Sequence, residues 1–282
     1  YGLGQATLMP IAAELSDSVA VGSVHEVVSV PDRVTPVVLT PSLEAPERKD
    51  VIMTVGAVDH VSALRGWPGR VVVKLQSSMR RYGTDPDSVE ELLASVAAAG
   101  IRTVGYSLHG ATVGTDEERL GEAITWAELL GAPRSISVSH LAPTSYRRLI
   151  DARPDVEWRL RAGTALWHGD KSALRLEADV VDRHAVSAGD RAGYHMVDVP
   201  GDGTVAMVGA GAAHAIAPVA APGGHWQSPF HFAGRRLALI EPPHMHTSMV
   251  FIPAGSPTPT TGEWVDVQRP LIGTAIDRLV WR

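Results

Sequence analysis

The chain has no cysteine among its 282 residues. This absence excludes disulfide bonds, thiolate nucleophiles and cysteine-ligated zinc. Aromatic residues are scarce at 5%, and no apolar run reaches the roughly 20 residues that a membrane-spanning helix needs. A signal-peptide pattern is also missing. We therefore expect a cytoplasmic protein without a membrane partner.

Positive charge is in deficit, with 25 Lys and Arg against 31 Asp and Glu, which gives a formal net charge of −6. A chain of this sign has no overall attraction to nucleic acid or to an anionic membrane. Its 45% hydrophobic and 20% charged residues are ordinary for a globular protein. The length suffices for one large or two medium domains.

The β-branched run Val71–Val73 predicts a strand buried on both faces, as in a parallel sheet. The run stops at Lys74, and a polar segment with Arg80, Arg81 and Gly83 follows before a helical pattern begins. In a βα-barrel, the loop between a strand and its helix lies on the face where active sites are built.

Strand and helix patterns alternate over the first 170 residues, which predicts parallel βαβ units in a barrel or a doubly wound sheet. The predicted strands are Val19–Ser23, Thr35–Thr40, Val51–Val55, Val71–Lys74, Arg102–Leu108, Ser135–Val138 and Trp158–Arg161. The predicted helices are Leu8–Leu15, Asp59–Leu64, Ser88–Ala99, Glu117–Leu130 and Ser145–Ala152.

The pattern changes near Leu174 to short alternating runs separated by turn clusters, which predicts an all-β domain. The runs are Leu176–Val181, Thr204–Val208, Leu237–Ile240, Met249–Ile252 and Trp264–Val267. The Ala-, Gly- and Pro-rich segment Gly209–Gly224 predicts a long loop. We expect residues 1–170 and 171–282 to form separate domains.

Several short motifs occur in the order known from one enzyme family. They are YGLG at Tyr1–Gly4, GSVHE at Gly22–Glu26, KLQSSMRRYG at Lys74–Gly83, SLHGA at Ser107–Ala111, LRAGTALWHG at Leu160–Gly169 and SAGDRAGYH at Ser187–His195. With them the chain resembles a divergent member of the alanine racemase family, the fold type III pyridoxal-phosphate enzymes. The resemblance implies a (β/α)8 TIM-like barrel followed by an all-β domain. It also implies pyridoxal 5'-phosphate, an amino-acid substrate and a homodimer in which the β domain completes the partner's active site.

The opening Tyr1–Gly4 is similar to the segment just after the lysine that binds the cofactor in this family. None of Lys49, Lys74 and Lys171 has a matching context. We therefore expect that lysine and the first barrel strand to precede Tyr1, with a genuine truncation as the alternative.

The resemblance assigns Arg161 to the pyridine nitrogen of the cofactor. A guanidinium does not readily give up its proton, so it would keep that nitrogen unprotonated and limit side reactions. Backbone N–H groups of Gly163 and Thr164 would bind the phosphate, and Tyr1 would add a phenol. A surface arginine at a strand end is the alternative interpretation of Arg161.

By the same resemblance, Arg81 would hold the phenolic oxygen of the cofactor or the substrate carboxylate, and Lys74 would support it. Lys74 could equally extend its amine to solvent. His109 would stack near the pyridine ring or be a satisfied core histidine. Ser139 and His140 stand where the family has Asn-Ser for the phosphate, and His140 is a departure that can still donate to phosphate.

Racemisation needs a proton removed from one face and returned on the other. In the family, a tyrosine of the partner's β domain serves one face, and counting from Tyr194 this position is Asp198. Asp198 could act as a base if desolvation raised its pKa, or it could begin the turn to Pro200. Tyr194 or His195 could substitute after a register shift. The family's Gly-Tyr-Ala-Asp-Gly loop has also become GAGAAHA at Gly209–Ala215.

His244 and His246 are spaced so that they would share one face of a strand, where two imidazoles could chelate a metal. There is no cysteine and no adjacent carboxylate, and Met245 matches a methionine of the family. We expect no metal.

These observations favour a pyridoxal-phosphate-dependent amino-acid racemase or epimerase. It would act through a lysine Schiff base and a second acid/base from the partner subunit, while the cofactor performs the carbanion chemistry. One alternative is a decarboxylase or lyase of the same fold, although the missing cysteine argues against the decarboxylase branch. The other is a catalytically silent cofactor-binding protein, which the missing tyrosine and altered loop suggest.

Overall fold

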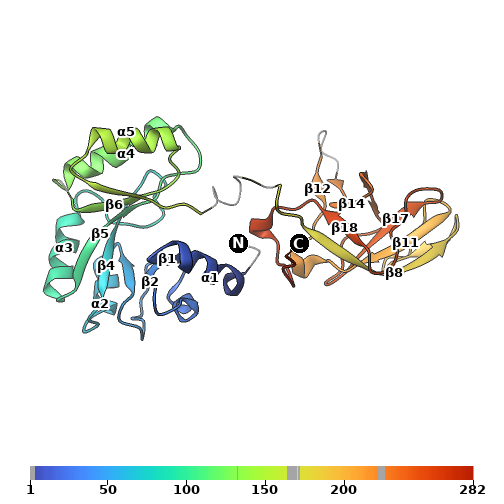
Figure 1. Cartoon of the computed structure of the whole chain (residues 1–282), viewed down its shortest axis with the longest axis horizontal. Coiled ribbons are helices and arrows are strands. Elements are labelled where there is room, and N and C mark those ends of the chain that lie inside the picture. The colour runs from blue at the N-terminus through green and yellow to red at the C-terminus, as the bar shows by residue number, and fades with distance from the viewer. Residues whose placement is uncertain (1–3, 132, 164–169, 171, 222–225, 282) are drawn as a thin grey trace. The chain divides into compact units, whose positions relative to one another are not determined.

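The computed structural model describes residues 4–131, 133–163, 170, 172–221 and 226–281 (Figure 1). The chain divides into two compact units, one formed by Leu8–Gly169 and the other by Tyr1–Thr7 together with Asp170–Arg282. Within the described residues, no helix combines the length and apolar character needed to cross a membrane.

The Leu8–Gly169 unit is built on a seven-stranded parallel sheet whose strands follow one another in chain order. The strands are β1 (Ser18–Val21), β2 (Thr35–Val38), β3 (Ile52–Val55), β4 (Arg70–Leu75), β5 (Arg102–Leu108), β6 (Ser135–Val138) and β7 (Glu157–Leu160). The helices are α1 (Gln5–Leu15), α2 (Val58–Ala63), α3 (Val89–Ala98), α4 (Asp116–Leu129) and α5 (Pro143–Ala152), with a 3-10 turn η1 (Val24–Ser29). Parallel strands in sequential order with intervening helices confirm the predicted βα-barrel class.

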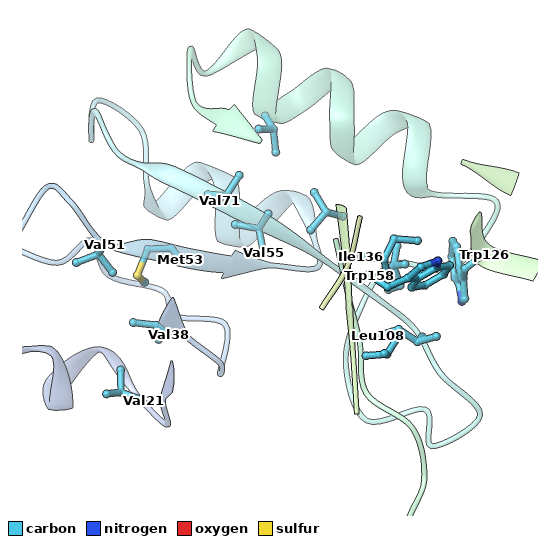
Figure 2. Close-up of a cluster of buried hydrophobic side chains, with 14 of the residues drawn as sticks. Val21, Val38, Val51, Met53, Val55, Val71, Leu108, Trp126, Ile136 and Trp158 are labelled. Carbon is cyan, nitrogen blue, oxygen red and sulfur yellow. The ribbon is translucent and has the colours of Figure 1, made fainter. Parts of the chain in front are cut away.

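The core of this unit lies between the strands and the helices that follow them. Figure 1 shows α3, α4 and α5 on the outer side of β4, β5 and β6. Side chains from all seven strands and from α4 meet in one buried cluster, which includes Val71 of β4 and Trp126 of α4 (Figure 2). Each fully buried large aliphatic side chain contributes about 1.5–3 kcal/mol to folding, so the valine-rich strands hold the polar strand ends in fixed positions.

The start of α4 is fixed by a capping box. Thr115 Oγ1 accepts a hydrogen bond from the Glu118 amide at 3.2 Å, and the Glu118 carboxylate accepts one from the Thr115 amide at 2.7 Å. Acidic residues of the first turn also suit the positive end of the helix dipole. The helix is therefore anchored where it begins, which fixes the two side chains, Glu122 and Trp126, that it directs at the β4 loop.

The second unit is an antiparallel β structure with a main sheet in the order β15-β14-β18-β8-β11-β17-β16. Those strands are β8 (Glu177–Val186), β11 (Gly203–Val208), β14 (Phe230–Phe232), β15 (Arg235–Arg236), β16 (Ala238–Leu239), β17 (Ser248–Pro253) and β18 (Trp264–Val267). Two short hairpins add β9 (Arg191–Ala192) with β10 (Val197–Asp198) and β12 (Val219–Ala220) with β13 (Trp226–Gln227). The 3-10 turns are η2 (Ala212–His214) and η3 (Leu271–Gly273).

The all-β prediction for this region is confirmed, with two corrections. The strand predicted at Leu176–Val181 continues to Val186, because its far end pairs with β11 despite its polar sequence. The predicted loop Gly209–Gly224 is not all loop: it contains η2 and β12, and its last residues lie outside the described part. Backbone hydrogen bonds from Ala212 to His244 O and from Ala213 to Met245 O hold η2 in place.

Candidate active site

Polar and charged side chains gather at the carboxyl ends of β4 to β7. Lys74 lies in β4, His109 follows β5, Ser139 and His140 follow β6, and Arg161 follows β7. Adjacent parallel strands end at the same edge of a sheet, so these side chains are brought together although up to 87 positions separate them. We call them the strand-end cluster.

His109 lies at the centre of the strand-end cluster. Its Nδ1 is 2.7 Å from Ser139 Oγ and 3.0 Å from Arg161 Nη2. A guanidinium nitrogen can only donate, so Nδ1 accepts and the ring proton belongs on Nε2. Burial, together with the charges of Arg161 and Lys74, lowers the pKa of His109 to about 3. The ring is therefore neutral near pH 7 and acts as a hydrogen-bond acceptor for Arg161.

Lys74 is buried, with only 4% of its surface exposed. The alternative that this amine extends to solvent is therefore wrong, because β4 continues to Leu75 and its loop closes over the strand end. Burial, followed by the positive charges of Arg161 and Arg81, lowers the pKa of Lys74 to about 7. A substantial fraction of the amine is thus uncharged at neutral pH.

Arg161 turns its guanidinium onto the end of β5. Besides His109, Nη2 lies 3.5 Å from the carbonyl of Leu108, and the Arg161 amide donates to Val138 O at 2.8 Å. Its Nε is buried without a hydrogen-bond partner among the described residues. Burial lowers the pKa of Arg161. A buried guanidinium with unused donor capacity is suited to an acceptor on a ligand.

His140 has a left-handed backbone, with φ +61°. This conformation is rare for a residue with a side chain and costs on the order of 1–3 kcal/mol. Its ring lies edge-on to His109, with the ring centroids 4.9 Å apart. Burial, Arg119 and Arg161 lower the pKa of His140. At this cost, the backbone places an imidazole against the strand-end cluster.

The loop after β4 carries Arg81 and is closed at its base by backbone hydrogen bonds. Thr84 donates to the carbonyl of Lys74, and Gln76 donates to the carbonyl of Thr84, both at 2.8 Å. Gly83 has φ +127°, and a Cβ there would lie 2.7 Å from the Gln76 amide nitrogen. Only glycine therefore fits this closure.

Helix α4 fixes the same loop from outside. Trp126 Nε1 donates to Gln76 O at 2.9 Å, and Glu122 Oε1 accepts from the Ser78 amide at 2.5 Å. Within the loop, the Arg81 guanidinium lies over the Tyr82 ring at 4.5 Å. Sequence reasoning missed Glu122 and Trp126. The loop residue that Glu122 contacts is 44 positions away in the sequence, and the one that Trp126 contacts is 50 positions away. No local sequence pattern marks contacts over such separations.

A second set of polar side chains connects the hairpin of β9 and β10 with the segment that carries Glu241 and His244. The Glu241 side chain is 1% exposed and accepts from the amides of Tyr194 at 2.8 Å and His195 at 3.0 Å. His195 Nδ1 lies 2.6 Å from one carboxylate oxygen, and His244 Nε2 lies 2.5 Å from the other. Burial alone would raise the pKa of Glu241, but the hydrogen bonds from His195, His244 and Tyr194 outweigh it and lower the pKa to about 2.

Asp198 lies apart from this group. Its side chain is 87% exposed and 3.5 Å from Arg191 Nε, so water and an arginine surround it. The Tyr194 ring packs on His244 with 4.5 Å between centroids. Sequence reasoning missed Glu241, since a lone glutamate before two prolines carries no visible signal.

The strand expected to align His244 with His246 is wrong, because β17 begins only at Ser248. His244 contacts Glu241, whereas the His246 ring faces His214 at 6.1 Å. In the described part of the chain, no group of three or more His, Cys, Asp or Glu is placed to hold a metal ion. Of the other predicted site residues, Gly163 follows Arg161 and is partly buried, while Tyr1 and Thr164 lie outside the described residues.

Comparison with known proteins gives one family match. The family described as alanine racemase, N-terminal domain, matches residues 1–170. A search of curated proteins finds no match.

Solved structures resemble nearly the whole chain. Alanine racemase from Bartonella henselae with covalently bound pyridoxal phosphate is 17% identical, with a TM-score of 0.67 over 96% of this chain and 81% of that chain. Alanine racemase from Bacillus anthracis with bound L-Ala-P is 19% identical, with a TM-score of 0.73 over 99% and 78% of the two chains. Alanine racemase from Clostridium difficile 630 is 16% identical, with a TM-score of 0.73 over 95% and 77%.

Proposed function

The chain belongs to the alanine racemase family, which its residues 1–170 match, and on this basis we propose that it is a pyridoxal-phosphate-dependent amino-acid racemase or epimerase. The similar Bartonella henselae enzyme contains covalently bound pyridoxal phosphate. Our proposal extends that cofactor to this chain because the strand-end cluster suits it.

The observation that carries the proposal is the pairing of Arg161 with His109 at 3.0 Å, beside a buried Arg161 Nε that has no partner in the described residues. A planar guanidinium oriented by a neutral imidazole is suited to a ring nitrogen that accepts a hydrogen bond. Burial, followed by the positive charges of Arg161 and Arg81, lowers the pKa of Lys74 to about 7, and a site with these positive charges favours a ligand that brings phosphate and phenolate.

We assign the pyridine nitrogen to Arg161 and the phenolic oxygen or the substrate carboxylate to Arg81, with Lys74 in support. His109 lies beside the ring position in this assignment. The phosphate-binding groups are Tyr1, Ser139, His140, Gly163 and Thr164.

Bound pyridoxal phosphate supplies an electron sink for the charge that develops on the substrate α-carbon. Arg161 keeps its own proton, which leaves the pyridine nitrogen unprotonated. The cofactor ring then withdraws electrons less strongly, which limits side reactions and still permits inversion. Two proton carriers on opposite faces are needed. The candidates on one face are Tyr194, His195 and Asp198, contributed by residues 171–282 of the partner in a homodimer.

The proposal is tested on the full-length protein by absorbance and intact mass with added pyridoxal phosphate, before and after borohydride. A new absorption band, with a cofactor-sized mass that borohydride fixes to the protein, supports the cofactor assignment. Each L- and D-amino acid of a standard panel is then incubated in D2O and followed by mass spectrometry and chiral chromatography.

Inversion with α-deuterium incorporation supports a racemase or epimerase. Bound cofactor without exchange for any amino acid would leave a silent binding protein, and release of CO2 would indicate a decarboxylase. Absence of any cofactor band or mass contradicts the proposal.

A further inference from the structure

We propose that the imidazole of His195, aligned by the buried carboxylate of Glu241, is the proton carrier on one face of the substrate. This inference rests on the proposed function and refines it, because three side chains of the hairpin were candidates for that role.

Glu241 holds His195 at two points. One carboxylate oxygen lies 3.0 Å from the His195 amide and 2.6 Å from His195 Nδ1. The amide bond fixes the backbone, and the Nδ1 bond fixes the orientation of the ring. Because the pKa of Glu241 is lowered to about 2, the carboxylate is ionised near pH 7 and accepts a hydrogen bond from the Nδ1–H group of His195. The tautomer that this bond selects has its lone pair on Nε2.

Side-chain exposure distinguishes His195 from His244. The His195 side chain is 70% exposed, whereas that of His244 is 19% exposed and uses Nε2 to contact Glu241. Of these two histidines, His195 has the buried carboxylate on Nδ1 and a largely exposed ring, which leaves Nε2 as the nitrogen that could serve a substrate. This is the arrangement of a histidine general base oriented by a carboxylate.

The two rival candidates lack this support. Asp198 pairs at 3.5 Å with Arg191, itself an exposed side chain, and not with a buried group that would orient it as Glu241 orients His195. The amide of Tyr194, not its phenol, contacts Glu241, and its ring packs on His244. Among the described residues, the titratable groups connected to His195 are Glu241, the His244 that shares this carboxylate, and the Arg191–Asp198 pair on the same hairpin.

The turn is built for close contact with the carboxylate. Gly193 has φ +81°, and a Cβ there would lie 2.2 Å from Glu241 Oε1. A side chain at this position would push the turn away from Glu241. The backbone therefore places the Tyr194 and His195 amides directly over a buried negative charge.

The Nε2 lone pair takes the α-proton, the electron pair of the C–H bond stays on the substrate, and the ring becomes an imidazolium stabilised by Glu241. In the reverse direction the same N–H returns its proton to the α-carbon. The carrier on the opposite face performs the complementary transfer.

The test uses the full-length holoenzyme and the amino acid that exchanges fastest in the panel. His195→Gln keeps a donor for Glu241 but cannot carry the proton. We expect inversion to fall by about 100-fold or more, while one enantiomer still exchanges its α-proton through the carrier on the other face. His184→Gln is the matched control, because His184 pairs with an exposed carboxylate, Asp182, at 3.2 Å. It should retain wild-type inversion.

Glu241→Gln supplies a readout that a purely structural role would not change. Without the carboxylate the imidazolium is less stable, so the acid limb of the pH–rate profile should move to lower pH. If this variant does not fold, His195→Gln decides alone. Inversion retained in His195→Gln overturns the inference. If Asp198→Asn loses inversion at the same time, Asp198 is the proton carrier instead. A wild-type holoenzyme that binds cofactor but exchanges no amino acid overturns the proposed function and this inference together.

Discussion

Arg161 donates a hydrogen bond from Nη2 to Nδ1 of His109 across 3.0 Å, so a neutral imidazole after β5 orients a guanidinium after β7. The direction of this bond also determines the tautomer of His109, because the arginine can only donate. Lys74 and His140 lie near the same ring, and the pKa of each is lowered. The site therefore gathers basic groups whose charged forms are disfavoured, and an anionic cofactor would stabilise those charged forms.

Replacing Arg161 by lysine should weaken binding of pyridoxal phosphate by about 10- to 100-fold. A lysine keeps the charge but loses the planar donor pair, and a hydrogen bond to a charged group contributes about 1.5–3 kcal/mol. The measurement is a spectroscopic cofactor titration. Arg159→Lys is the control, since Arg159 lies two positions earlier and pairs with Glu157 at the surface. Equal affinity of the two variants would remove Arg161 from the cofactor site.

Replacing Lys74 by methionine should change how stability depends on pH. The pKa of Lys74 is about 7 in the folded chain and about 10.4 when unfolded. The unfolded state therefore binds more protons between these values, and the free energy of unfolding rises with pH in that window. Between pH 7.5 and 9.0 the wild type should gain about 2 kcal/mol more than Lys74→Met, because one proton contributes about 1.4 kcal/mol per pH unit.

Urea unfolding without cofactor at both pH values measures this difference. Lys49→Met is the control, because Lys49 is exposed and should leave the wild-type slope intact. A slope in Lys74→Met that equals the wild-type slope would mean that the Lys74 amine stays solvated and charged.

Replacing Trp126 by phenylalanine should loosen the loop after β4, which carries Arg81, and weaken cofactor binding severalfold. The change removes the indole N–H that Gln76 O accepts at 2.9 Å, and such a hydrogen bond contributes about 1 kcal/mol. Trp158→Phe is the control, because its indole donates to Arg153 O at 3.0 Å and not to the loop. If both variants lower stability equally and neither changes the cofactor titration, α4 does not position the loop.

The local part of the fold is readable from the sequence. The strands Arg102–Leu108 and Ser135–Val138 have the predicted bounds, because apolar periodicity depends on near neighbours. The family resemblance assigned Lys74, His109 and Arg161 to one cofactor site, and the structure brings them together because parallel strands end at the same edge of the sheet. The sequence also carried the family resemblance that the match over residues 1–170 bears out.

Contacts that depend on packing between distant segments could not be predicted. Glu241 contacts residues 46 and 47 positions away, and its burial follows from how two segments meet. The burial of Lys74 was equally undecided, because a lysine at a strand end can extend to solvent or stay inside. The histidines of His244–His246 were assigned to a strand because spacing alone does not reveal where a turn ends.

Replacing Gly193 by alanine should destabilise the Asp170–Arg282 unit more than replacing Gly189 does. Both glycines have left-handed backbones, with φ +81° and +92°, so both variants bear the conformational cost of about 1–2 kcal/mol. A Cβ at residue 193 would also lie 2.2 Å from Glu241 Oε1, whereas one at residue 189 meets nothing within 4 Å. Overpacking adds about 1–3 kcal/mol, so the difference between the two variants isolates the contact with Glu241.

Urea unfolding measures this difference, and NMR of the His195 ring reports whether the bond to Glu241 survives in Gly193→Ala. We expect the variant to lose that bond together with inversion activity, because the turn carries His195 away from the carboxylate. Equal destabilisation of the two variants, with an unchanged His195 signal, would show that Glu241 moves aside easily. The glycine would then be required only for its backbone angle, and the close approach of the turn to the buried carboxylate would not determine where His195 lies.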